Sequence, residues 1–339
     1  MKLDQDKYSR FHLVREMCET PDIIAGFDAN QAQETAGEIA RVGRLLLTGE
    51  GSSRLFPAKS NINHARRQGL SIALHTEAGR QAAEYKLADW AVFAASNSGK
   101  TAEVIGLFQT LKAAGHQHLY SLSAAADTKL ESLATRGHVL SCGKEDAVAA
   151  TKSVVEQALF YRALLEHTVS TPTLGPRLSE LAEEFRDALT MEIDAGIVKR
   201  VAEARVIYWA GRNDGVAEEL TLKTNEITRK TADFLEGTYA VHGIEEVMHP
   251  EDVVLWVDPY EESEQKFQEV LAKGVGLTVI AISGRNTRFP TIRIPDSGNL
   301  SPYTHLAIGW NLLVEVGLRL GVDLDKPQRA RKVGNEFAG

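Results

Sequence analysis

Short apolar runs alternate with segments of helical length through most of this chain, and this alternation constrains its fold more than any other feature. The runs are brief enough to be buried parallel strands. They cover residues 45–48, 71–75, 90–95, 118–122 and 138–141. The segments between them have helical length and period and cover residues 56–68, 79–86, 102–114 and 126–135. Because parallel strands need such crossovers, the pattern predicts a doubly wound α/β fold of flavodoxin type.

The second half of the chain shows the same plan. A long helical pattern at 150–167 closes the first half, and a turn-rich linker and a helical segment at 177–203 follow. Further strands are expected at 205–210, 253–257, 277–282 and 291–294. In each half an apolar run ends in a glycine-rich turn before a helix, at 48–53 and at 210–215. We therefore predict one parallel-sheet lobe used twice.

Composition and charge argue against several classes of protein. With 339 residues, 43% of them hydrophobic and 25% charged, the chain suits about two globular domains. A net charge of −8 argues against a general binder of nucleic acid or of anionic membranes, which needs a basic surface. No apolar stretch approaches the roughly 18 to 20 residues that span a bilayer. We expect a cytoplasmic protein with no nucleic-acid and no membrane partner.

The two cysteines, Cys18 and Cys142, lie far apart in the sequence and lack the spacing of metal ligands. They support neither a disulfide scaffold nor a zinc site, so each is expected to be a buried thiol. No metal and no organic cofactor is predicted.

A hydroxyl-rich turn joins the run 90–95 to the helical segment that follows it. Ser96, Ser98 and Thr101 surround Gly99 at the start of that segment. Hydroxyls and the free N–H groups of a helix N-terminus together bind phosphate or another tetrahedral anion. N-capping explains one Ser or Thr at such a position, but three hydroxyls exceed what a cap requires. We predict a local anion site at the carboxyl ends of the strands, shared with Ser53.

Two segments together resemble the phosphosugar-binding signature of the sugar isomerase (SIS) family. They are Gly51-Ser52-Ser53 and Ser96-Asn97-Ser98-Gly99-Lys100-Thr101, where the family commonly has Ser-Gln-Ser-Gly-Glu-Thr. The resemblance covers nearly the whole chain and is to the two-lobed type, which includes the isomerase domain of glucosamine-6-phosphate synthase and phosphosugar deaminases and deglycases. It implies that Ser53, Ser96, Ser98 and Thr101 hold the phosphate and that Gly51, Ser52 and Asn97 complete that site.

A further segment, Val148-Ala149-Ala150-Thr151-Lys152, resembles the family's Val-Ala-Ser-Thr-Lys turn, which lines the sugar. The resemblance implies that Val148 and Ala149 contact the substrate. Ala150 stands where the family has serine.

The second half carries three charged residues, Glu219, Lys223 and Glu226, at helical spacing on one face. A solvent-exposed stripe of salt bridges would explain the spacing of these three residues equally well. The segment around them resembles the family's Lys-Leu-Lys-Glu-Ile helix, which implies that Glu226 is the proton-transfer base and that Lys223 contacts the substrate. His242 follows Glu226 by sixteen residues, the family's spacing to its ring-opening histidine.

The chain also departs from the family around His242. Tyr239 stands in place of the usual glutamate and Val241 in place of the usual basic residue, so the identity of the sugar does not transfer. Downstream, residues 323–333 resemble the family's Asp-x-Asp-x-Pro-Arg-x-Leu-x-Lys-x-Val tail. Lys332 then matches a lysine that reaches C1 or C2 of the open-chain sugar. A solvated basic terminus is the alternative reading of this segment.

The resemblance implies a sugar-phosphate aldose-ketose isomerase or deaminase that needs no cofactor. His242 would open the ring, and Glu226 would move a proton between C1 and C2. Three alternatives stay open: a 6-phosphofructosyl-amine deglycase, an isomerase of a 6-sulfo sugar whose sulfonate replaces phosphate, and a non-catalytic phosphosugar-binding regulator. Ammonia from glutamine is not expected, because no glutaminase-like cysteine domain precedes the lobes.

We expect four parts: a helical segment at 1–34, a first lobe at 35–170, a second lobe at 171–325 and a tail at 326–339 that closes the active site. The resemblance also implies a homodimer in which His242 reaches the site of the neighbouring subunit.

Overall fold

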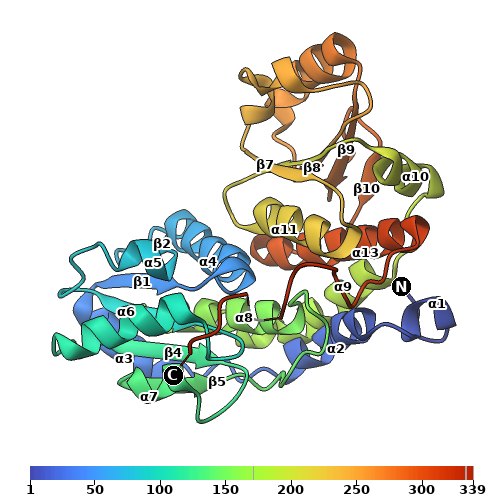
Figure 1. Ribbon diagram of the computed structural model, residues 1–339. Coiled ribbons are helices and arrows are strands. Elements are labelled where there is room, and N and C mark those ends of the chain that lie inside the picture. Colours follow the sequence, from blue (N-terminus) through green and yellow to red (C-terminus); the bar gives the residue numbers. More distant parts are fainter. Residues whose placement is uncertain (171, 333, 339) are drawn as a thin grey trace. The chain divides into compact units, whose positions relative to one another are not determined.

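A computed structural model describes residues 1–170, 172–332 and 334–338 and divides the chain into two compact units (Figure 1). The first lobe comprises Asp22–Asp146, Ala150–Glu180 and the residues from Ala330 onward. The second lobe comprises Met1–Pro21, Ala147–Ala149 and Leu181–Arg329. The predicted boundary residue Thr171 and the predicted tail residues Val333 and Gly339 lie outside the described residues. The predicted ranges 35–170 and 171–325 remain our proposal for the two repeats.

The first lobe contains a five-stranded parallel sheet in the order β2-β1-β3-β4-β5. The strands are β1 Arg44–Thr48, β2 Ala73–Glu77, β3 Ala91–Ala95, β4 Leu119–Ser123 and β5 Arg136–Val139. The central strands β3 and β4 are buried along their whole length, as expected for a sheet covered on both faces. All five lie where strands are predicted, but the edge strands β2 and β5 are each shifted by two residues. These edges are partly exposed, so apolar runs mark their ends poorly.

Helices cover both faces of this sheet (Figure 1). They are α3 Gln33–Val42, α4 Leu55–Arg67, α5 Gly79–Ala82, α6 Ala102–Ala113, α7 Lys129–Leu133 and α8 Lys152–Thr168. On one face α3 and α4 pack against α8, whose Phe160 and Tyr161 meet the ring of Phe93 edge-on. On the other face α6 and α7 cover Val92 and Ala94. The helix α8 is buried almost throughout, because the sheet and two helices surround it.

The second lobe contains another five-stranded parallel sheet, in the order β10-β9-β8-β6-β7. The strands are β6 Ile207–Gly211, β7 Ala232–Glu236, β8 Val253–Val257, β9 Thr278–Ser283 and β10 Thr291–Arg293. Strand β7 was not predicted from the sequence. This strand lies at the edge of the sheet, and Leu235 is its one fully buried residue, so it lacks the apolar run of a central strand.

The main helices of the second lobe are α1 Asp6–Ser9, α10 Ala195–Glu203, α11 Val216–Thr228, α12 Glu264–Phe267, the π-helical segment η6 Gln268–Val275 and α13 Ser301–Leu320. Two more helices, α2 His12–Gly26 and α9 Leu178–Thr190, include residues of both units. The single helix predicted at 177–203 is therefore wrong: α9 ends at Thr190 and α10 begins at Ala195. Asp194 separates them, since its side chain accepts a hydrogen bond from the Ile197 N–H at 3.0 Å and caps α10.

The two lobes share one connectivity. Numbered from its own first strand, each sheet has the order 2-1-3-4-5. In each lobe the helix before the first strand and the helix after it both pack against the long helix that follows the fifth strand: α3 and α4 against α8, and α10 and α11 against α13. The predicted duplicated parallel-sheet lobe is confirmed. Among the described residues, no helix combines the length and the apolar character needed to cross a membrane.

Candidate functional site

The first lobe has its topological switch point between β1 and β3, which are neighbours in the sheet while the helices that follow them cover opposite faces. Open α/β sheets bind ligands at this point, beyond the carboxyl ends of the strands. The turn after β1 and the turn after β3 approach each other closely at Gly49. A Cβ atom there would lie 2.9 Å from the Ser53 carbonyl oxygen and 3.0 Å from that of Ala95. Only glycine permits this approach, which brings the Gly51–Ser53 turn beside the turn after β3.

The hydroxyls of the turn after β3 bind one another. Ser96 Oγ and Thr101 Oγ1 are 2.8 Å apart, and Ser98 Oγ accepts the Lys100 N–H at 3.2 Å. Thr101 is the N-cap residue of α6, yet its side chain makes no capping hydrogen bond. N-capping, the alternative considered for these hydroxyls, therefore does not occupy them.

The backbone of this turn leaves donors available. The Gly99 N–H donates to the Ser96 carbonyl oxygen at 3.0 Å, whereas the N–H groups of Asn97 and Ser98 find no acceptor in the described parts of the chain. Gly99 has φ of +64°, the left-handed conformation that one residue of an anion-binding nest adopts. The turn thus offers two backbone donors beside three hydroxyls.

The second predicted segment, Gly51-Ser52-Ser53, forms a 3₁₀ turn directly after β1, η1 Gly51–Ser53. Ser52 is buried, while Ser53 is partly exposed. The Ser53 N–H donates to the Glu50 carbonyl oxygen at 3.2 Å, which closes the turn. The structure thus brings Ser53 and the Ser96–Thr101 turn to the same end of the first-lobe sheet.

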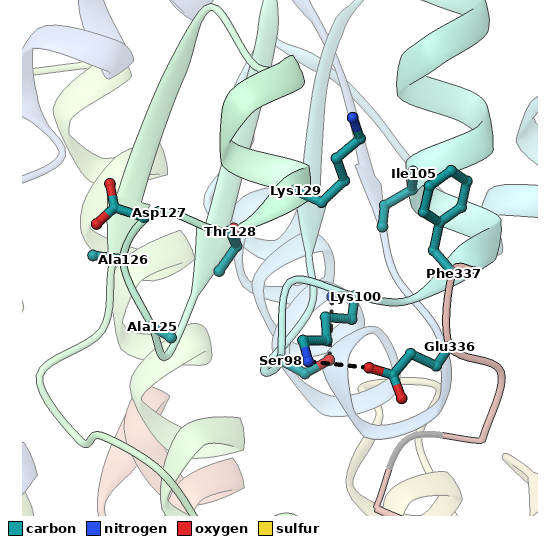
Figure 2. Close-up of a pocket in the computed structure, with 10 residues that line it drawn as sticks. All are labelled: Ser98, Lys100, Ile105, Ala125, Ala126, Asp127, Thr128, Lys129, Glu336 and Phe337. Carbon is teal, nitrogen blue, oxygen red and sulfur yellow. Dashed lines mark hydrogen bonds and ion pairs between the residues drawn. The ribbon is translucent and has the colours of Figure 1, made fainter. Parts of the chain in front are cut away.

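The C-terminal tail pairs with this same turn (Figure 2). The Phe337 N–H donates to the Lys100 carbonyl oxygen at 2.9 Å, and the Ala102 N–H donates to that of Asn335 at 3.0 Å. Lys100 also forms an ion pair with Glu336 at 3.1 Å. The tail thus runs antiparallel beside the start of α6, with Lys332 preceding the paired residues.

A cavity of about 450 Å³ lies beside this pairing (Figure 2). Its lining comes from the Ser96–Thr101 turn, α6, the loop after β4, the start of α7 and the tail. Ser98 lines it, but Ser53, Ser96 and Thr101 do not. The cavity therefore adjoins the predicted anion site only through Ser98.

Lys332 lies next to Glu145, a residue that was not predicted from the sequence to belong to the site. Its Nζ is 3.6 Å from Oε2 of Glu145, whose side chain is fully buried. The same carboxylate accepts hydrogen bonds from Asn97 Nδ2 at 2.8 Å and from the Thr151 N–H at 2.6 Å. The one signal in the sequence was a pair of acids, Glu145 and Asp146, just before the predicted sugar-lining turn. Within that turn, Val148 donates to the Asp325 carbonyl oxygen at 3.4 Å and Ala149 is buried; both belong to the second lobe.

In the second lobe the predicted charged residues form a buried chain on α11. Lys223 Nζ lies 2.7 Å from Glu226 Oε2 and 3.3 Å from Glu219 Oε1. The side chains of Lys223 and Glu219 are fully buried, so the solvated stripe considered as an alternative is wrong. Glu226, with 21% of its side chain exposed, is the member of the three that reaches solvent. Burial alone would lower the pKa of Lys223, but the carboxylates of Glu226 and Glu219 outweigh it and raise that pKa, so the ammonium stays charged.

His242 follows the short 3₁₀ turn η3 Tyr239–Val241, after β7, and is exposed. Its Nε2 lies 3.3 Å from the Thr238 hydroxyl. Within the described part of the second lobe, no hydrogen bond or ion pair joins His242 to Glu226. Tyr239 beside it is 51% exposed.

The second lobe's own switch point lacks the hydroxyl chemistry. Its turn after β8 begins with Asp258, which has φ of +45° and forms an ion pair with Arg212. The turn continues through Tyr260 into two glutamates, and carboxylates there would repel an anion. In the turn after β6, burial raises the pKa of Asp214 to about 6. Among the described residues, a hydroxyl-rich turn at the switch point therefore occurs in the first lobe alone.

Comparison with known proteins agrees with this architecture. No family model matches the chain. The glutamine–fructose-6-phosphate aminotransferase (isomerizing) of Xylella fastidiosa strain Temecula1 is 26% identical over 258 residues, which cover 70% of this chain and 42% of that protein. The chain thus spans about two fifths of the length of the curated relatives that it matches.

Solved structures match over almost the whole chain. The C-terminal domain of glucosamine-fructose-6-phosphate aminotransferase from Francisella tularensis has a TM-score of 0.78 at 17% identity and covers 95% of this chain and 100% of its own. The chain has a sugar isomerase fold. Tagatose-6-phosphate ketose/aldose isomerase from Escherichia coli (TM-score 0.76, 16% identity, 96% and 99% covered) and glucosamine-6-phosphate deaminase from Thermotoga maritima (0.72, 18%, 97% and 99%) share this fold. The predicted resemblance to the sugar isomerase family is confirmed.

Proposed function

We propose that this chain binds an open-chain 6-phosphosugar or amino-sugar phosphate and catalyses its isomerisation or deamination by acid/base proton transfer. The observation that carries this proposal is the Ser96–Thr101 turn, with its unpaired N–H groups at the switch point of a sugar isomerase fold. The named activities of the structural neighbours, a ketose/aldose isomerase and a deaminase acting on 6-phosphosugars, support it.

In this proposal the anion is held by local donors, as the net charge of −8 requires. The hydroxyls of Ser53, Ser96, Ser98 and Thr101 and the N–H groups of Asn97 and Ser98 bind the phosphate, and Gly51 and Ser52 shape the turn. Hydrogen bonds to a charged phosphate contribute about 1.5–3 kcal/mol each. Val148, Ala149 and Lys332 contact the sugar, with the Lys332 amine directed to C1 or C2.

Glu226 is the proposed base. Its carboxylate is partly exposed and is held by the Lys223 ammonium at 2.7 Å. Since Lys223 is fully buried, it contributes to substrate binding through Glu226. Proton transfer between C1 and C2 needs one base on one face of the substrate, and a well-placed general base contributes about 10²- to 10⁴-fold. His242 carries the proton to and from the ring oxygen when the sugar opens.

We further propose a cytoplasmic homodimer in which His242 acts on the substrate of the neighbouring subunit. The support is the exposure of His242 and of Tyr239 beside it, together with the family resemblance. No metal or organic cofactor takes part in the proposed steps.

The substrate class is tested by incubating the protein with a panel of compounds and identifying the products by mass spectrometry. The panel contains hexose and hexosamine 6-phosphates, 6-phosphofructosyl amino acids and a 6-sulfo hexose. An isomer or released ammonia from a 6-phosphate supports the proposal. A released amino acid indicates the deglycase, turnover of the sulfo sugar indicates the sulfonate reading, and binding without turnover of any compound indicates a regulator.

The base is tested with Glu226→Gln. The amide is nearly isosteric but cannot accept the proton, so we expect kcat to fall by about 10²-fold or more while the KM of the 6-phosphate changes little. Glu218→Gln, on the same helix, serves as the control and should keep full activity. Exchange of the C1 or C2 proton with solvent at the wild-type rate in Glu226→Gln would place the base elsewhere.

A further inference from the structure

Glu145 lies between β5 and α8, and its surroundings suggest more than a structural role. Its side chain is fully buried in the first lobe. A carboxylate removed from water is strongly unfavourable unless hydrogen-bond donors surround it. The hydrogen-bond donors around Glu145 therefore identify the segments that this carboxylate positions.

Those donors come from separate segments of the chain. Oε1 accepts the Thr151 N–H at 2.6 Å and the Thr151 hydroxyl at 3.2 Å, at the start of α8. Oε2 accepts hydrogen bonds from the Ser153 hydroxyl at 2.6 Å and from Asn97 Nδ2 at 2.8 Å. Asn97 belongs to the Ser96–Thr101 turn, called the anion turn from here on. The Lys332 ammonium of the tail lies 3.6 Å from the same oxygen. An ionised carboxylate is an acceptor at both oxygens, so it satisfies all of these groups at once.

We propose that Glu145 is the positioning residue of the candidate site and couples the anion turn to the amine of Lys332. This coupling has a consequence for Asn97. Because its Nδ2 is directed at Glu145, its Oδ1 is left buried and without a partner among the described residues. A buried amide oxygen offers no donor to a phosphate, so the Asn97 side chain anchors the Ser96–Thr101 turn to Glu145, and the Asn97 N–H remains for the anion. The catalytic part of this inference rests on the proposed function.

A second buried carboxylate on α8 shows that burial alone does not create this link. Glu156 accepts hydrogen bonds from the Ser141 N–H and hydroxyl at 2.8 and 2.7 Å and from the Cys142 N–H at 2.8 Å. It makes none to Asn97 or Lys332 among the described residues. Glu156→Gln is therefore a matched control: it disturbs a buried carboxylate of similar surroundings without touching the site.

The connection that Glu145 makes between the anion turn and Lys332 is tested first without any substrate. Glu145→Gln places an amide NH₂ among donors and removes the charge that attracts Lys332. We expect the amide hydrogens of Ala102 and Phe337, which hold the tail beside the anion turn, to exchange about tenfold faster in Glu145→Gln than in the wild type. Glu156→Gln should leave both rates unchanged. Equal rates in Glu145→Gln and the wild type overturn the proposal.

The catalytic role is tested by separating phosphate binding from turnover. The hydroxyls of Ser98 and Thr101 make no hydrogen bond to Glu145, so Glu145→Gln should bind inorganic phosphate within about twofold of the wild type while kcat falls about tenfold or more. Equal losses of phosphate affinity and kcat would indicate a merely structural role and overturn the proposal. A wild-type protein that neither binds phosphate nor turns over a phosphosugar refutes the proposed function, and the exchange measurement then still decides the link.

A second variant covers the case in which Glu145→Gln does not fold. Lys332→Met removes the tail partner at a side chain that is 31% exposed and leaves the hydrogen bonds of Glu145 to α8 and Asn97 in place. Exchange at Ala102 and Phe337 should accelerate as in Glu145→Gln. Unchanged exchange in Lys332→Met overturns the link on its own.

Discussion

At the scale of single residues, the hydroxyls of the anion turn are not used to cap the helix that follows them. A Ser or Thr before a helix usually caps it, but here the Thr101 hydroxyl pairs with Ser96 and α6 begins without a side-chain cap. The hydroxyls were identified from sequence because their number exceeded the needs of a cap. Glu145 was not identified, because nothing in its local sequence shows that Asn97 and Lys332 lie beside it.

The hydroxyls themselves are tested with Ser98→Ala combined with Thr101→Ala. Each substitution removes a hydrogen bond to the charged phosphate, so the KM of a 6-phosphosugar should rise by about tenfold or more per hydroxyl. Thr110→Ala serves as the control, since Thr110 lies on α6, is exposed, and its hydroxyl bonds only the Gly106 carbonyl oxygen among the described residues. Steady-state kinetics with unchanged KM in the double variant would show that this turn does not hold the anion.

At the scale of elements, the turn after β3 keeps its shape because it packs against the start of α7. A Cβ atom on Gly99 would lie 2.3 Å from Cβ of Thr128, the N-cap residue of α7. The Leu130 N–H also donates to the Gly99 carbonyl oxygen at 3.2 Å. The tight turn is thus positioned by a helix that follows it by almost thirty residues, and the capping box of Thr128 and Glu131 fixes that helix in turn.

Gly99→Ala tests this packing. The substitution combines a φ of +64° with a steric clash, so we expect the free energy of unfolding to fall by about 2–4 kcal/mol and the KM for phosphosugar to rise. Gly106→Ala is the matched control, because a Cβ at that position of α6 meets no atom within 4 Å. Gly106→Ala should raise the free energy of unfolding by up to about 1 kcal/mol. Denaturant titrations of the two variants that shift in the same direction would contradict this account.

At the scale of the whole molecule, the duplicated lobe has kept its connectivity while its chemistry has diverged. Both sheets have the same strand order, yet the hydroxyl turn occurs in the first lobe and an acidic turn occupies the equivalent place in the second. The second lobe instead carries the buried charged chain that ends at Glu226. Function in the proposal therefore depends on both lobes, and on a second copy of the chain for His242.

Subunit mixing tests the shared site. Homodimers of Ser98→Ala and of His242→Ala should each be impaired, whereas mixing them under subunit exchange should restore activity to about a quarter or less of the wild-type value. This follows because half of the dimers are mixed, and one of the two sites in each mixed dimer combines both wild-type residues. Exchange is verified by native mass spectrometry. Full activity from a monomer in sedimentation, or no recovery despite verified exchange, would exclude a histidine supplied in trans.

The sequence by itself determined the fold class, the duplication and the hydroxyl-rich turn after β3. Each of these follows from a local pattern: buried runs of strand length, helical segments between them, and hydroxyls clustered around one glycine. It did not reveal the edge strand β7 or the break between α9 and α10, since exposed edges and short caps carry little hydrophobic signal. Only the tertiary structure decided what surrounds Glu145 and that Lys223 is buried between two carboxylates. Burial and pairing arise from contacts between segments, and the energy of a charged group depends on those contacts more than on its neighbours in sequence.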